Sequence, residues 1–153
     1  MTTAQNLREF FRQKRRSAKT KNIDWAARRD SWIKAVENLY KKIVQSYLAA
    51  PISEGSVTVG YREKAIFEEY IGEYQVRELV VRTGDEKVVF SPKAAVVVGG
   101  IGRLDLVGDF GEVSLLRKPW GRWFIIASRA PAVRVFPLNE ESLLIALKSV
   151  MRQ

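Results

Sequence analysis

Residues 73–91, EYQVRELVVRTGDEKVVFS, contain the pattern that decides the fold. Apolar residues recur with a period of two through 73–82 and 86–91, which is typical of β-strands with one buried face. Gly84 and Asp85 separate the two runs, and a glycine beside an aspartate favours a tight turn between antiparallel strands. The stretch therefore predicts a β-hairpin.

The same period extends on both sides of this hairpin. We expect strands at 56–61, 64–71, 73–82, 86–91, 94–98, 103–107, 112–117, 122–128 and 132–136. The segments between them are short and rich in glycine and proline, so they leave no room for the helices that connect parallel strands. The sequence therefore predicts an antiparallel sheet or a small, partly closed barrel.

Helical periodicity flanks this body. Residues 4–21 form one expected helix, and a second runs from Asp24, its N-cap, to about Leu48, where Pro51 ends it. Its apolar residues recur at near-heptad spacing: Trp25, Trp32, Val36, Leu39, Ile43 and Tyr47. This spacing favours burial of Trp25 and Trp32 in the core over the alternative that they stack on nucleic-acid bases. After Pro137, Asn139 is the expected N-cap of a last, leucine-rich helix.

These patterns predict an α+β fold in a single domain, residues 1–153. A basic helical pair (1–50) packs on an antiparallel β body (54–137), and a C-terminal helix (139–152) closes it. No apolar run is long enough to span a membrane, and no targeting segment is apparent, so we expect a soluble cytoplasmic protein.

The formal net charge of +9 is concentrated in the first quarter of the chain. Residues 1–42 contain 12 Lys and Arg against four acids, whereas residues 43–153 contain 14 against 13. At helical spacing, five cations share one face, and we call them the basic stripe: Arg8, Arg12, Arg15, Arg16 and Lys19. Such a stripe suits the phosphates of a nucleic acid or an acidic protein partner.

Other interpretations of the basic stripe remain open. Its charges can simply keep a helix soluble, or they can pair with the acidic edge at residues 63–78, which we expect to be solvated. A membrane surface is less favoured, because few apolar residues follow Phe11 on the opposite face.

The composition restricts catalysis. The chain has no histidine and no cysteine, which excludes histidine-dependent triads, thiolate chemistry and the usual zinc sites. We expect no metal and no cofactor. The sequence thus favours a non-enzymatic binding module over an enzyme.

The alternative is a carboxylate- and divalent-metal-dependent hydrolase, such as a nuclease, that uses Asp105 with Asp109 or Glu112. If residues 108–111 form a turn, Val107 lies opposite Glu112 and Asp105 opposite Ser114. The next strand lacks the lysine that such sites use, so we expect Asp105 to form an ion pair with Arg103 on the same face.

Two further segments are candidate binding features, but the sequence does not indicate what either would bind. Trp120 and Arg122 lie at a turn and form a candidate recognition tip. The glycines of residues 99–102 lack the third glycine of a dinucleotide-binding turn, so they predict a strand junction or bulge that either packs or lines a pocket.

Overall fold

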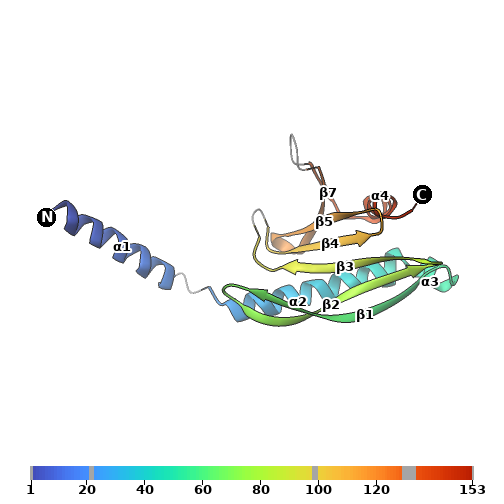
Figure 1. Ribbon diagram of the computed structural model, residues 1–153, viewed down its shortest axis with the longest axis horizontal. Coiled ribbons are helices and arrows are strands. Elements are labelled where there is room, and N and C mark those ends of the chain that lie inside the picture. The colour runs from blue at the N-terminus through green and yellow to red at the C-terminus, as the bar shows by residue number, and fades with distance from the viewer. Residues whose placement is uncertain (1, 21–22, 98–99, 129–133, 153) are drawn as a thin grey trace.

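The computed structural model describes residues 2–20, 23–97, 100–128 and 134–152 (Figure 1). The elements follow in this order: α1 (Thr3–Thr20), α2 (Trp25–Lys42), the π-helical turn η1 (Ile43–Tyr47), α3 (Ala49–Ser53), β1 (Thr58–Glu68), β2 (Gly72–Thr83), β3 (Glu86–Ala94), β4 (Arg103–Gly108), β5 (Gly111–Lys118), the 3₁₀ turn η2 (Pro119–Gly121), β6 (Arg122–Ser128), β7 (Arg134–Pro137) and α4 (Glu140–Val150). The predicted α+β fold is confirmed.

The seven strands form one antiparallel sheet in the order β1 to β7, so each strand pairs with the next along the chain. This is the antiparallel sheet that the sequence predicts. Among the described residues β1 and β7 do not pair with each other, and the sheet is open rather than closed into a barrel. Arg82 pairs with Lys87 and Thr83 with Glu86, which confirms the hairpin around Gly84.

The β4–β5 hairpin has the register that the sequence predicts. Asp105 lies opposite Ser114, and Val107 lies opposite Glu112. The pairing ends at Gly108 and Gly111, where the turn begins. This register decides which side chains share a face with Asp105.

Two predicted strand boundaries are wrong. Strand β1 is continuous from Thr58 to Glu68, where a break was expected near Arg62 and Glu63. Both residues pair with β2, because neither restricts the backbone as glycine or proline would. The strand expected at 94–98 is not formed within the described residues, where Val97 makes a single bridge to Gly100.

Helix α2 supplies one side of the core, as its near-heptad pattern predicts. Trp32, Val36 and Ile43 are completely buried. The hydroxyl of Tyr40 lies within hydrogen-bonding distance of the carbonyl oxygens of Arg77 (2.8 Å) and Phe90 (3.1 Å), so the ring is fixed against β2 and β3. Asp24 is the N-cap of α2, as the sequence predicts.

The sequence predicted that Pro51 ends the second helix, but helical structure continues past this residue. After Lys42 the chain forms a π-helical turn in which the Leu48 N–H donates to the Ile43 carbonyl at 2.8 Å. A short helix, α3, follows and includes Pro51 in its first turn, where the missing N–H of proline costs no helical hydrogen bond. Because π-helical hydrogen bonds join residues five apart instead of four, the side chains after Lys42 do not continue the side-chain spacing of α2.

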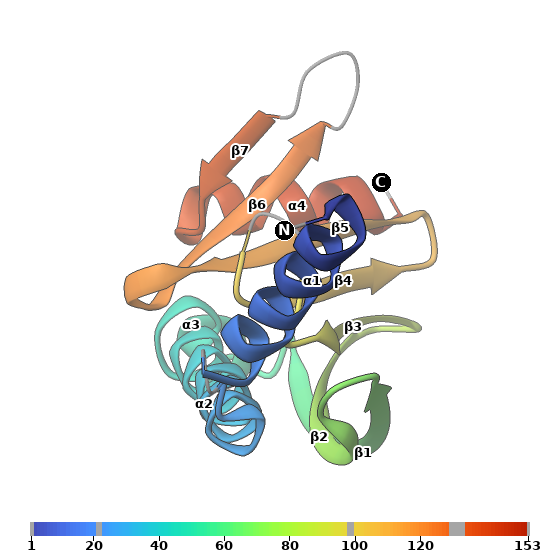
Figure 2. The same ribbon diagram turned by 90° about the vertical axis from the view of Figure 1, so that its left-hand side faces the viewer.

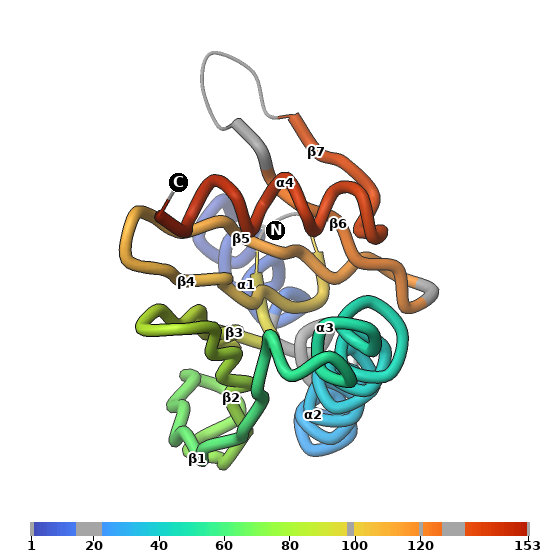
Figure 3. Tube along the Cα trace, turned by 90° about the vertical axis from the view of Figure 1, so that its right-hand side faces the viewer, coloured from blue at the N-terminus to red at the C-terminus, as the bar shows by residue number. Residues whose placement is uncertain are grey.

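Helix α4 packs against β4 and β5, at a different part of the sheet from α2 (Figure 3). Asn139 and Ser142 form a capping box, which confirms the predicted N-cap. Leu143, Ala146 and Val150 are buried, and the Phe110 N–H donates to the carbonyl of Val150 at 3.0 Å. Helices α2 and α4 therefore pack on different strands of the sheet.

Helix α1 is the part of the expected helical pair that does not join the core. It projects away from the sheet in Figure 1, and in Figure 2 it points toward the viewer, in front of the sheet. Its large apolar residues are exposed: Leu7 by 55%, Phe10 by 52% and Phe11 by 65%. None of the helices in the described ranges is long and apolar enough to cross a bilayer.

Candidate functional site

The described part of the basic stripe is exposed on α1. Arg8 and Arg12 both lie at the surface, four residues apart and so on one face of the helix. Arg15, Arg16 and Lys19 belong to the same helix, but their side chains lie outside the described residues. No salt bridge between described side chains joins α1 to an acid. Arg8 and Arg12 are therefore available to a partner.

The acidic edge at residues 63–78 is solvated only in part: Glu63, Glu69 and Glu73 are exposed as expected, whereas Glu68 and Glu78 have partners in the sheet. The carboxylate of Glu68 accepts hydrogen bonds from the backbone N–H groups of Ala95 (3.0 Å) and Val96 (3.1 Å). The Tyr74 hydroxyl donates to the same carboxylate at 2.5 Å. Burial, and secondly this hydrogen bond, raise the pKa of Tyr74. Glu68 thus ties β1 to the segment that follows β3.

Glu78 also departs from the expected solvated edge, since only 8% of it is exposed. Its carboxylate accepts a hydrogen bond of 2.6 Å from Arg62. Burial acts to raise the pKa of Glu78, but hydrogen bonds from Ser91 and Arg62 outweigh it, and the pKa lies below its ordinary value. Nearby, the Lys64 ammonium donates to the Ser91 hydroxyl at 2.8 Å. The carboxylate is held ionised by these partners.

Asp105 forms an ion pair with Arg103 within β4. Arg103 donates two hydrogen bonds of 3.0 Å to its carboxylate, as the shared face predicts, and Asp105 is 2% exposed. Asp109 lies in the turn and Glu112 at the exposed end of β5, so the structure does not gather the three acids. Within the described ranges no group of three potential ligand residues could hold a metal.

The glycine-rich segment after β3 packs closely where it is described. The Ile101 N–H donates to the Arg117 carbonyl at 2.8 Å, and the Arg117 N–H donates to the Gly102 carbonyl at 2.8 Å. Gly100 lies against Leu116 and Gly102 against Trp32, where a Cβ on either would collide. The described glycines therefore serve packing, while Gly99 lies outside the described residues.

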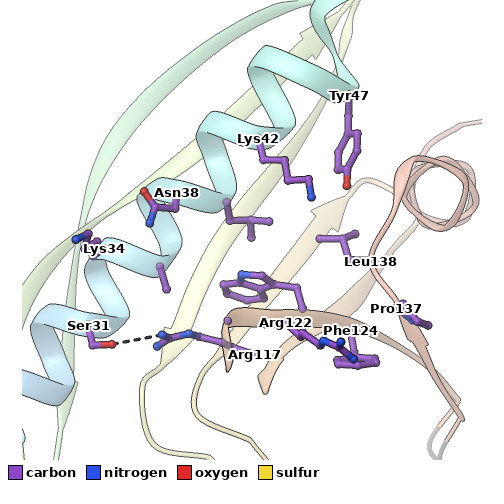
Figure 4. Close-up of a pocket in the computed structure, with 14 residues that line it drawn as sticks. Ser31, Lys34, Asn38, Lys42, Tyr47, Arg117, Arg122, Phe124, Pro137 and Leu138 are labelled. Carbon is purple, nitrogen blue, oxygen red and sulfur yellow. Dashed lines mark hydrogen bonds between the residues drawn. The ribbon is translucent and has the colours of Figure 1, made fainter. Parts of the chain in front are cut away.

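A cavity of about 590 Å³ opens between α2 and the strands β5 to β7, and we call it the basic cleft (Figure 4). Ser31, Lys34, Asn38 and Lys42 line it from one face of α2, and Arg117 and Arg122 line it from the sheet. Tyr47, Trp123, Phe124 and Leu138 supply its aromatic and apolar surface. Four cations thus line the cavity, and none of the described residues that line it is a carboxylate.

The acids of α2 lie outside the basic cleft. Asp30 pairs with Arg29 at 3.0 Å, and Glu37 pairs with Arg77 of β2. The hydrogen bond to Glu37 raises the pKa of Arg77. Because these carboxylates are directed to other cations, the charge of Lys34 and Lys42 is not compensated within the cleft.

Arg117 is the most enclosed cation of the cleft. Its guanidinium donates to the Ser31 hydroxyl at 3.3 Å (Figure 4), and its buried Nε has no hydrogen-bond partner among the described residues. Burial lowers the pKa of Arg117, which means that no acid offsets the cost of enclosing the charge. A buried donor without a partner is unfavourable unless a ligand supplies an acceptor.

The structure describes only one of the two side chains of the predicted recognition tip. Trp120 lies in η2, but its side chain lies outside the described residues. Arg122 is exposed at the start of β6 and lines the basic cleft. The structure therefore brings Arg122 together with Arg117 rather than with the basic stripe.

Sequence reasoning missed the cleft as a site, although it selected Arg122. Lys34, Lys42 and Arg117 carry no motif, and their proximity follows from the packing of α2 beside β5 and β6. The one signal in the sequence is the helical spacing of Ser31, Lys34, Asn38 and Lys42 along a polar row of α2.

Comparisons of the chain with models of known protein families, with curated proteins and with solved structures find no match. What the protein does is therefore inferred from its own residues.

Proposed function

We propose that the protein is a non-enzymatic nucleic-acid-binding module whose basic stripe contacts the phosphates of a single strand. The observation that carries this proposal is the exposure of Arg8 and Arg12 on a helix that projects from the body, with no salt bridge to a described carboxylate. The chain has 17 acids, and two of those in the nearby edge, Glu68 and Glu78, have other partners. An external polyanion is the natural complement of such a surface.

The dimensions of the stripe suit several phosphates. From Arg8 to Lys19 an α-helix rises by about 16 Å, at about 1.5 Å per residue. Phosphates along one strand are several ångströms apart, so the five cations of the stripe can contact successive ones. Each such contact releases a counterion from the nucleic acid, which makes binding depend on salt.

The exposed phenylalanines favour a nucleic acid over an acidic protein. Phe11 is 65% exposed and, by helical spacing, lies beside Arg8 and Arg15. Phe10 packs edge-to-face on Phe11 with ring centroids 5.3 Å apart. Aromatic rings next to cations allow bases to stack while phosphates are neutralised, which is how single strands are bound without sequence preference.

Fluorescence anisotropy with labelled oligo(U) RNA tests the proposal. Replacing Arg8 and Arg12 together by Gln should weaken binding about tenfold, because two phosphate contacts are lost. The matched control replaces Arg82 and Arg134, two exposed arginines of β2 and β7, by Gln and removes the same charge. The control should bind as the wild type does.

Competition separates the two classes of partner. Unlabelled oligo(U) should displace the labelled RNA, whereas polyglutamate of the same charge should not, since it has no bases to stack. Displacement by polyglutamate at the same concentration would instead indicate an acidic protein partner and overturn the proposal. The expected cytoplasmic location belongs to the same proposal, and cell fractionation tests it.

A further inference from the structure

The basic cleft contains more positive charge than its own residues neutralise. Lys34, Lys42, Arg117 and Arg122 all line the same cavity, and none of the described residues that line it is a carboxylate. Such clustering raises the local concentration of anions and is favourable when an anion occupies the space. The cleft therefore has the electrostatics of a site for a multiply charged anion.

The cleft also presents hydrogen-bond donors toward one volume. In Figure 4 the Lys42 ammonium and the Tyr47 hydroxyl point into the same space, with Leu138 on the opposite side. Lys42 lies 5.8 Å from the centre of the Tyr47 ring. The π-helical turn places Tyr47 here, and such turns occur frequently at functional sites.

The remaining surface of the cleft is aromatic and apolar. Trp123 is half-buried and packs against Trp32 with ring centroids 5.8 Å apart, so its position is fixed by the core. Phe124 and Leu138 extend this surface. A volume of about 590 Å³ is within the range of pockets that hold small organic ligands. A free phosphate ion would leave this apolar surface without a contact.

We propose that the basic cleft binds a nucleoside phosphate, with its phosphates on Lys42, Arg117 and Arg122 and its base against Trp123 and Leu138. Arg117 is the most enclosed of these cations and lines the cleft from β5. The same chemistry is found in a free mononucleotide and at the phosphorylated end of a strand. This site involves no residue of α1, so it goes beyond the proposed role of the basic stripe.

Isothermal titration of the full chain with ADP, adenosine and inorganic phosphate tests this site. ADP should bind at least about tenfold more tightly than adenosine or phosphate, because only ADP makes both kinds of contact. Lys42→Gln should weaken ADP binding about five- to tenfold. Its neighbour Lys41 is exposed and does not line the cleft, so Lys41→Gln is the matched control and should have no effect.

The source of the ligand is distinguished by a further titration, with a 5′-phosphorylated oligonucleotide and its unphosphorylated form. Preference for the phosphorylated strand over ADP supports a strand end, and the reverse supports a free nucleotide. The variant in which Gln replaces Arg8 and Arg12 should bind ADP as the wild type does. Loss of RNA binding by the basic stripe and loss of ADP binding by the basic cleft are therefore measured separately. Absence of ADP binding, or equal effects of Lys42→Gln and Lys41→Gln, would overturn the proposal.

Discussion

Gly102 lies directly against the indole ring of Trp32, which is completely buried. The φ angle of Gly102 is +154°, and a Cβ at this position would overlap the ring. Both the backbone conformation and the lack of space therefore require glycine here. The contact joins α2 to the start of β4, close to the basic cleft.

Gly102→Ala should lower the free energy of unfolding by about 2–4 kcal/mol, because it combines backbone strain with overpacking of the core. Urea unfolding followed by tryptophan fluorescence measures the change. Gly60→Ala in β1 is the control, since nothing lies within 4 Å of its added Cβ and the residue is exposed. An equal loss in both variants would contradict this explanation.

The sequence alone predicted the parts of the fold that depend on local patterns. The β4–β5 register follows from the turn between Gly108 and Gly111, because the turn fixes which residues lie opposite one another. The burial of Trp32 follows from its place in a near-heptad row of α2. Asn139 is an N-cap because its side chain accepts from the helix N–H groups.

Features that depend on distant packing could not be predicted in this way. Lys42 is followed by a π-helical turn, whose hydrogen bonding has no simple sequence pattern. Arg117 is 75 positions later in the chain, and its proximity to α2 depends on the curvature of the whole sheet. Glu68 was expected in solvent, but its carboxylate accepts hydrogen bonds from two backbone N–H groups. Because every residue except proline has such a group, the sequence does not indicate which of them will reach Glu68.

The stability of the protein should depend on pH through Glu78. Its folded-state pKa is below the ordinary value of 4.5, so ionised Glu78 stabilises the folded state. This contribution is fully present above pH 4.5 and is lost as the pH falls through the folded-state pKa. The stability difference between wild type and Glu78→Gln should therefore be constant from neutral pH to about 4.5 and shrink below it.

Denaturant unfolding of both proteins across this pH range measures the effect. Glu69→Gln is the control, because Glu69 is an exposed glutamate that precedes β2. If wild type instead gained stability relative to Glu78→Gln as the pH fell from neutral to 4.5, burial would dominate and the pKa of Glu78 would be raised.

Phe11→Ala should separate stability from binding. Because Phe11 is exposed on a projecting helix, the free energy of unfolding should change by less than about 0.5 kcal/mol. Affinity for oligo(U) should fall about tenfold, since stacking on one base contributes about 1–3 kcal/mol. Phe110, which is 63% exposed in the β4–β5 turn, is the matched control. If Phe110→Ala weakens RNA binding as much, Phe11 has no specific role.

The salt dependence of RNA affinity tests the basic stripe most directly. A plot of log Kd against log salt has a slope of about 0.7 for each phosphate of a single strand that a cation contacts. Replacing Arg8 and Arg12 by Gln should therefore reduce the slope by about 1.4, while the Arg82 and Arg134 pair leaves it unchanged. A wild-type slope near zero, or the same reduction in both double variants, would contradict a phosphate-binding role for α1.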